Sequence, residues 1–284
     1  PAPQTENIEE TEAPVATPTE EILPSPTPSE ESIEITHQIT PGEPGFVSKW
    51  FYDTDSSSNA SAGSVTGGDD YIANLFERPF TAGEMAYRAD LDIVRAEITH
   101  DDTFIYTNIF VAGEHPEGGL PGNYGIEIDW NRDGSGDLLV LAQNPPQNEW
   151  DIAGVSVTTD FNDDVGGRNI LRPDNDYQGD SYDREVFSMD VLNDPDSAWA
   201  RWRPGAEPVV TIAFKESLLS GNSTFVWGVW AGDSLLNPEN MDLHDYFTQA
   251  EAGSPYASHS QYPLKDLSLI DNTCRETFGF EPTA

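Results

Sequence analysis

Oxygen-bearing side chains recur at alternate positions in residues 129–137, which read Asp-Trp-Asn-Arg-Asp-Gly-Ser-Gly-Asp. Calcium takes six to eight oxygen ligands at about 2.3–2.6 Å, and glycines let a short loop turn tightly enough to bring alternate side chains to one point. The spacing therefore predicts a structural calcium site with the ligands Asp129, Asn131, Asp133, Ser135 and Asp137. The alternative is an acidic hairpin turn, in which the same residue types serve local turn geometry alone.

The EF-hand pattern offers a comparison for this loop. The segment opens as D-x-N-x-D-G, but Val140 stands at the twelfth position, where an EF-hand has glutamate, and strand-like sequence flanks the loop. A helix-loop-helix site is therefore excluded. A second and weaker alternating series, ahead of two glycines at 166–167, consists of Asp160, Asn162 and Asp164.

Residue patterns typical of catalysis are missing from this sequence. The five histidines form no H-x-x-x-H pair, and neither a G-x-S-x-G elbow nor a P-loop is present. Among 51 Asp and Glu residues some carboxylate pair will fall at glycosidase spacing by chance, so such a pair carries no weight. We expect the protein not to be an enzyme.

Trp199 and Trp202 alternate with arginines in residues 198–203. Tryptophan rings can stack on sugars or fill a core. Because charged residues and a Pro-Gly turn accompany this pair, it is a better candidate than Trp227 for an exposed platform that binds glycans. The alternative is that both side chains are buried in the core.

From residue 88 onward the chain alternates apolar and polar residues at the period of a β-strand, with frequent Gly and Pro between segments. The pattern predicts an all-β fold, a two-sheet antiparallel β-sandwich of jelly-roll type. Short helices fit at 75–77 or 243–250. The expected strands cover residues 91–98, 104–111, 124–130, 137–143, 149–158, 208–214 and 224–231.

Residues 1–45 hold nine prolines, ten glutamates and seven threonines but no Lys or Arg. Such a composition cannot bury a core and predicts an extended acidic stalk. Residues 46–284 are long enough for a single β-sandwich domain with an irregular C-terminal extension.

One stretch of the stalk differs, because Ile33, Ile35 and Ile39 follow a period of two over residues 32–40. This predicts a strand. The strand either belongs to the chain's own domain or completes the sheet of a neighbouring copy, in which case copies of the chain would form a head-to-tail homopolymer.

The formal net charge of −38 argues against nucleic acid as a partner, because few cationic groups are available to replace counterions. The longest apolar runs are strand-sized, so no transmembrane segment is expected.

The sequence begins at Pro1 without a leader, which suggests a mature exported chain, extracellular or on the cell surface. Cys274, the single cysteine, predicts either an intermolecular bond or a bonding partner missing from this chain, with a buried free thiol as the alternative.

Several blocks resemble secreted bacterial β-sandwich proteins related to family 9 carbohydrate-binding modules and DOMON-like domains. The matching blocks are residues 89–93, 104–111, 124–129 and 209–214, within about 87–233. The resemblance implies a jelly-roll-like sandwich, structural calcium and, in some members, sugar binding between aromatic rings. Residues 242–275 resemble uncharacterised exported bacterial proteins.

Together these features predict a non-catalytic extracellular structural protein, a self-assembling cell-surface or filament subunit that uses its N-terminal strand to complete a neighbour's sheet. The alternative is a calcium-stabilised carbohydrate-binding module on a stalk.

Overall fold

The computed structural model describes residues 35–65, 67–161, 165, 182–233 and 248–281. These residues form two antiparallel sheets, so the predicted β-sandwich is confirmed. The compact unit begins at Thr36, before the boundary expected at residue 46. Within this part of the chain, no helix has the length and apolar character needed to cross a membrane.

The smaller sheet has five strands in the order β1-β3-β4-β10-β9. Neighbouring strands β3 and β4 form a hairpin, and β10 pairs with both β4 and β9. Its strands are β1 (Lys49–Tyr52), β3 (Ile93–His100), β4 (Phe104–Val111), β9 (Ala198–Arg203) and β10 (Val209–Lys215).

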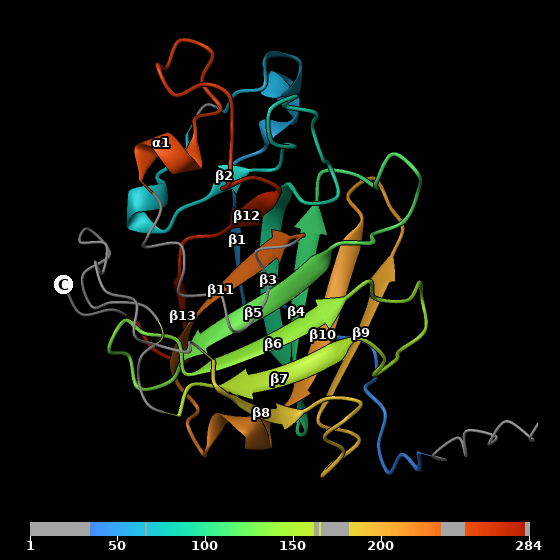
Figure 1. Ribbon diagram of the computed structural model, residues 1–284. Helices are drawn as coiled ribbons and strands as arrows, with labels where there is room; N and C mark the ends of the chain where they lie inside the picture. The colour runs from blue at the N-terminus through green and yellow to red at the C-terminus, as the bar shows by residue number, and fades with distance from the viewer. Residues whose placement is uncertain (1–34, 66, 162–164, 166–181, 234–247, 282–284) are drawn as a thin grey trace, which may run out of the picture. The chain divides into compact units, whose positions relative to one another are not determined.

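The larger sheet has the order β2-β12-β11-β5-β6-β7-β8, and β13 also pairs with β11 (Figure 1). Its strands are β2 (Glu77–Arg78), β5 (Asn123–Asp129), β6 (Leu138–Gln143), β7 (Val155–Thr159), β8 (Arg184–Phe187), β11 (Phe225–Gly232), β12 (Ile270–Asn272) and β13 (Glu276–Phe278).

The core lies between the facing sides of the two sheets. Phe51 of β1 contacts Trp227 of β11 across it, with ring centroids 5.1 Å apart. Trp227, Tyr124 and Phe214 are fully buried. Because side chains alternate along a strand, the residues between these core positions point away from the other sheet.

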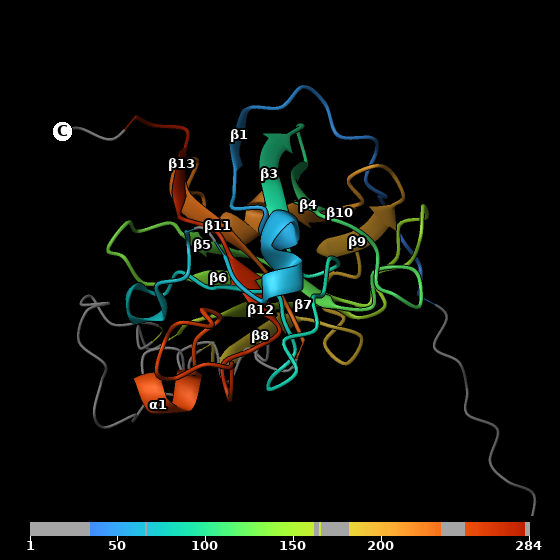
Figure 2. The same ribbon diagram turned by 90° about the horizontal axis from the view of Figure 1, so that it is seen from above.

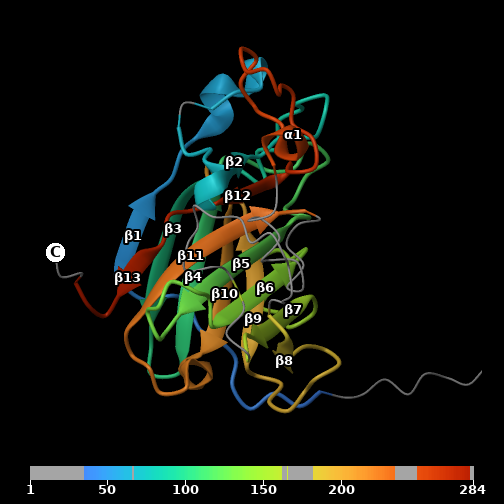
Figure 3. The same ribbon diagram turned by 60° about the vertical axis from the view of Figure 1, so that its left-hand side comes forward.

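The short helices η1, η2 and α1 lie at the same end of the sandwich as β2 and β12, whereas η3 lies at the opposite end (Figures 1 and 3). Thr248 caps α1 and pairs reciprocally with Glu251 in a capping box. The helices are η1 (Ser56–Ala62), η2 (Tyr71–Ala73), η3 (Glu216–Leu219) and α1 (Gln249–Ala252).

Three sequence-based expectations need correction. Glu77, expected in a helix over 75–77, lies in β2, and of the helix expected over 243–250 only its end overlaps α1 in the described residues. The strand expected from residue 149 begins at Val155, because Gly154 adopts a positive φ of 74°. Residues 198–203, expected as an exposed platform, form β9.

Candidate functional site

Four carboxylates from distant parts of the sequence meet at the end of the sandwich that carries β2 and β12. Asp53 follows β1, Glu77 lies in β2, Asp92 precedes β3 and Asp271 lies in β12. One side-chain oxygen from each of Asp53, Glu77 and Asp271 lies within 4.8 Å of the other two. We call Asp53, Glu77, Asp92 and Asp271 the acidic cluster.

Main-chain and hydroxyl donors hold three members of the acidic cluster in place. The Ser56 hydroxyl donates to Glu77 Oε1 at 2.7 Å, and the Ser56 N–H donates to Asp92 Oδ2 at 3.1 Å. The Ile93 N–H donates to Asp271 Oδ2 at 2.6 Å. Glu77, Asp92 and Asp271 are buried. The local chain therefore fixes these carboxylates without neutralising their charge.

Two oxygens of the acidic cluster are buried without a hydrogen-bond partner, namely Asp53 Oδ2 and Asp271 Oδ1. Such atoms are rare in folded proteins because each loses its hydration without compensation. Both belong to the three residues whose oxygens converge. The unpartnered atoms point to a ligand that accepts electron pairs.

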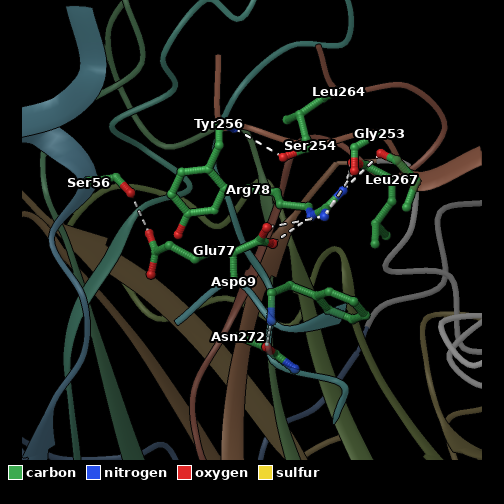
Figure 4. A network of polar contacts seen from close by, with 12 residues as sticks. Ser56, Asp69, Glu77, Arg78, Gly253, Ser254, Tyr256, Leu264, Leu267 and Asn272 are labelled. Atoms are coloured by element: carbon green, nitrogen blue, oxygen red, sulfur yellow. Dashed lines mark hydrogen bonds and ion pairs between the residues drawn. The ribbon is translucent and has the colours of Figure 1, made fainter. Parts of the chain in front are cut away.

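Nearby cationic side chains have other partners. Arg78 follows Glu77 but turns away from Ser56, and its Nε donates to Asp69 at 2.6 Å (Figure 4). Arg88 is paired with Asp90. Among the residues that the structure describes, no ion pair includes a member of the acidic cluster.

Burial raises the pKa of every member of the acidic cluster, because it penalises the charged form. The pKa of Asp53 and of Asp92 rises to about 7, and the pKa of Glu77 rises to about 10. The pKa of Asp271 lies well above its usual value. Repulsion from other members of the acidic cluster adds to the shifts of Asp53, Glu77 and Asp271, and repulsion from Asp55 adds to that of Asp92. A bound cation would relieve both the desolvation and the repulsion.

The donor set suits a hard divalent cation. Oxygens bound at about 2.4 Å to one ion lie no more than about 4.8 Å apart, which the convergent oxygens of Asp53, Glu77 and Asp271 satisfy. Carboxylates alone, without histidine or cysteine, favour calcium, magnesium or manganese over zinc. The residues present therefore fit such an ion.

The sequence-predicted calcium loop 129–137 connects β5 and β6. Asp129 accepts main-chain N–H groups from Arg132 and Gly134, and Asp137 Oδ2 accepts those of Trp130 and Asn131 at 2.7 and 3.1 Å.

Side-chain oxygens also accept main-chain N–H groups further along this loop. Asn131 Oδ1 accepts the Asp133 N–H at 2.8 Å, and Asp133 Oδ1 accepts the Ser135 N–H at 2.9 Å. Arg275 donates to the Gly134 carbonyl at 2.6 Å. These contacts are typical of a polar hairpin turn, and calcium binding by the loop stays a prediction.

The second predicted series begins beside this loop. Asp160 follows β7, and its N–H donates to the Asp137 carbonyl at 3.2 Å. Asp160 Oδ2 accepts the Val165 N–H at 2.9 Å. Asn162 and Asp164 lie outside the described residues.

The carboxylates of the loop 129–137 also affect one another. Burial, together with repulsion from Asp129 and Asp133, raises the pKa of Asp137 to about 6.

The predicted glycan platform at Trp199 and Trp202 is wrong. Both side chains are buried, with only 4% and 6% of their surface exposed. The His37 ring lies 4.5 Å from that of Trp199. Exposed aromatic side chains occur instead on β1, where the Trp50 and Tyr52 rings are nearly perpendicular, at 76°.

The expected assembly strand over 32–40 is not a strand in its described part, which starts at Ile35. Asp196 accepts the N–H groups of Gln38 and Ile39 at 2.8 and 3.0 Å, so these donors are not available to a sheet. Ile39 is 38% exposed, and Ile33 lies outside the described residues.

Cys274 is exposed, so the expectation of a buried free thiol is wrong. An intermolecular bond through Cys274 stays a prediction.

Sequence reasoning missed the acidic cluster. Its members form no local motif, since they are scattered between residues 53 and 271. The available signal was a carboxylate next to apolar strand residues, as in Leu91-Asp92-Ile93 and Ile270-Asp271. That pattern marks a buried charge but does not identify which charges meet.

Comparisons with protein-family models, with curated proteins and with solved structures found no match. The resemblance to family 9 carbohydrate-binding modules and DOMON-like domains therefore stays an expectation.

Proposed function

We propose that this chain is a non-catalytic structural protein of the extracellular space, stabilised by a calcium ion in the acidic cluster. One observation carries the proposal. Asp53 and Asp271 bury carboxylate oxygens that lack a hydrogen-bond partner, next to Glu77, and no ion pair among the described side chains includes any of the three.

The position of the acidic cluster supports a structural role. Asp53 continues from β1 of the five-stranded sheet, whereas Glu77 and Asp271 belong to β2 and β12 of the larger sheet. An ion bound by all three would connect the two sheets at one end of the sandwich. Because the ligands converge only after folding, the ion stabilises the folded state, by about 2.7 kcal/mol at 100 times its dissociation constant.

Burial also separates this site from a catalytic one. Glu77 and Asp271 are 1% and 0% exposed, so these two carboxylates are out of reach of a substrate, and Asp53 is half-buried. Catalytic metal sites keep a position for water or substrate. A closed site supports stabilisation rather than turnover.

Calcium and an extracellular location belong together in this proposal. Extracellular calcium modules bind the ion with dissociation constants of about 10⁻⁴–10⁻³ M, and such sites are filled only where calcium is abundant. A net charge of −38 also favours a medium rich in divalent cations, which screen repulsion within the chain.

The test compares two single-carboxylate variants, Asp271→Asn in the acidic cluster and Asp133→Asn in the loop 129–137. We expect calcium to raise the melting temperature of the wild type and of Asp133→Asn, and calorimetry to show a lost binding event in Asp271→Asn. Asparagine preserves the acceptor for the Ile93 N–H, so the variant should fold.

Three outcomes count against the proposal. An equal calcium shift in Asp271→Asn and wild type would exclude the acidic cluster as the site. Loss of the shift only in Asp133→Asn would assign calcium to the loop. A melting temperature unchanged by calcium and by chelator in all three proteins would remove the metal altogether.

A further inference from the structure

The segment 36–48, which we call the strap, crosses the side of the five-stranded sheet that faces away from the other sheet. It runs from the region of β9 to β1 (Figure 2). His37 pairs with Asp196 at 2.7 Å near β9, and the Phe46 carbonyl accepts from the Thr99 hydroxyl at 2.6 Å on β3. The strap therefore spans the sheet from one edge to the other.

The sheet surface beneath the strap is polar. Strand register places Glu97, Asn108, Thr211 and Arg201 in one row across β3, β4, β10 and β9. The Thr211 hydroxyl donates to Asn108 at 2.8 Å, whereas Arg201 donates to Glu43 of the strap at 2.8 Å.

The pair between Arg201 and Glu43 is asymmetric. The Arg201 side chain is 6% exposed and lies over the Trp150 ring, 4.2 Å from its centroid, whereas the Glu43 side chain is 68% exposed. Arg203 contacts the same carboxylate at 3.1 Å. Arg201 Nε is buried without a partner. A buried guanidinium thus relies on a carboxylate at the surface, which another carboxylate can replace.

Residues 40–43 of the strap read Thr-Pro-Gly-Glu, and two of them form hydrogen bonds with the sheet. Pro41 is buried, the Gly42 N–H donates to the Tyr106 hydroxyl at 3.2 Å, and Glu43 binds Arg201 and Arg203. None of these contacts uses the side chain at the third position.

The same pattern, Thr-Pro-x-Glu, occurs at 17–20 as Thr-Pro-Thr-Glu and at 27–30 as Thr-Pro-Ser-Glu. A Cβ built on Gly42 meets no atom within 4 Å, and its φ is not positive. Serine or threonine therefore fits at the third position, so both upstream segments can make the contacts of residues 40–43.

We propose that residues 40–43 occupy a docking site for Thr-Pro-x-Glu segments, formed by Tyr106, Arg201 and Arg203, and that residues 27–30 of a second copy of this chain bind there when residues 40–43 leave. The inference goes beyond the proposed function and does not depend on the metal.

Competition within one chain sets the conditions for this exchange. Residues 40–43 are tethered next to the site and have a high effective concentration, so a second copy competes only at high protein concentration or when the tethered segment is weakened.

The contact between two copies is heterologous, because the N-terminal segment of one copy binds the sheet surface of the other. Repeated contacts of this kind produce open chains of copies rather than closed dimers.

Sedimentation velocity on the full chain tests the proposal with glutamine substitutions. Glu43→Gln weakens the tethered segment, so we expect its apparent association constant to rise roughly tenfold above wild type. Adding Glu20→Gln and Glu30→Gln should abolish this association. Adding Glu12→Gln and Glu21→Gln, which change the charge equally outside the pattern, should not.

A peptide covering residues 25–32 gives a second measurement. It should bind the Glu43→Gln chain and alter the fluorescence of Trp150, which lies beside Arg201. Arg201→Gln in the same background, or a scrambled peptide of equal charge, should abolish binding.

Two outcomes would overturn the inference. One is a Glu43→Gln chain that stays monomeric at high concentration. The other is equal behaviour of the Thr-Pro-x-Glu variants and their charge-matched controls, which would leave only nonspecific electrostatics. Melting curves of each variant show whether the sandwich is intact.

Discussion

Asp53 and Asp271 each bury one carboxylate oxygen without a hydrogen-bond donor, and these residues continue strands of different sheets. Asp53 follows edge strand β1, and Asp271 lies in β12 near the edge of the larger sheet. The free energy of unfolding therefore depends on whether a proton or a cation neutralises these two carboxylates. This dependence leads to the first two predictions.

Glu77→Gln should have opposite effects with and without calcium. The pKa of Glu77 is raised to about 10 by burial and neighbouring carboxylates, so in chelator near neutral pH folding requires Glu77 to take up a proton. Glutamine removes this cost and should raise the melting temperature. In calcium the same substitution removes a ligand and should lower the melting temperature relative to wild type. Calorimetric scans in both conditions measure the crossover; a variant less stable than wild type in both would contradict it.

In chelator, the free energy of unfolding should fall as the pH rises from about 5 to 9. In the folded chain the pKa values of Asp53 and Asp92 are about 7 and that of Glu77 is about 10, all above the ordinary carboxyl values of about 4, so the folded state binds more protons across this window. Stability from this source is present at low pH and is lost as the pH passes the folded values.

General repulsion in a chain of charge −38 also changes with pH. The Glu77→Gln variant shares that repulsion but lacks one member of the acidic cluster, so its stability should fall less steeply. Urea unfolding at a series of pH values gives both slopes. Equal slopes would assign the pH dependence to general charge rather than to the acidic cluster.

Trp202→Ala should destabilise the protein by about 3–5 kcal/mol, since its side chain is 6% exposed in β9. Trp50→Ala, at a side chain 54% exposed, should change stability by no more than about 0.5 kcal/mol. Denaturant unfolding compares the two. A small effect of Trp202→Ala together with a loss of glycan binding would restore the platform hypothesis.

Local patterns predicted the hairpins of this fold well. The near-continuous apolar run over 104–111 matches β4, and the turn residues of 129–137 do connect two neighbouring strands, because hairpin formation depends on nearby residues. β9 was not predicted as a strand. Its Trp and Arg residues suggested exposure, but both faces of the strand are covered, one by the core and one by the strap.

The acidic cluster could not be predicted in the same way. Its position depends on β2 and β12, strands of two and three residues that are defined only by pairing with distant partners. Sequence periodicity needs a longer window than these strands provide. Likewise, the side chain of Asp196 takes the N–H groups that the alternating isoleucines seemed to offer to a sheet.

Asp196→Ala should release the start of the strap without unfolding the sandwich. Asp196 is buried and accepts the N–H groups of Gln38 and Ile39 besides pairing with His37. Burial alone would raise the pKa of Asp196, but these partners outweigh it and lower the pKa below its ordinary value. The contribution of Asp196 to stability is therefore present above about pH 4 and is lost as the pH falls through the lowered pKa.

Hydrogen exchange measures this release. Exchange should be faster at Gln38 and Ile39 in the variant, and in the wild type under acid, while amides of β4 keep their protection. Asp190→Ala, at an exposed aspartate in the loop before β9, is the control and should exchange like wild type. Unchanged protection at Gln38 and Ile39 in Asp196→Ala would mean that the strap is held mainly by Pro41 and Glu43.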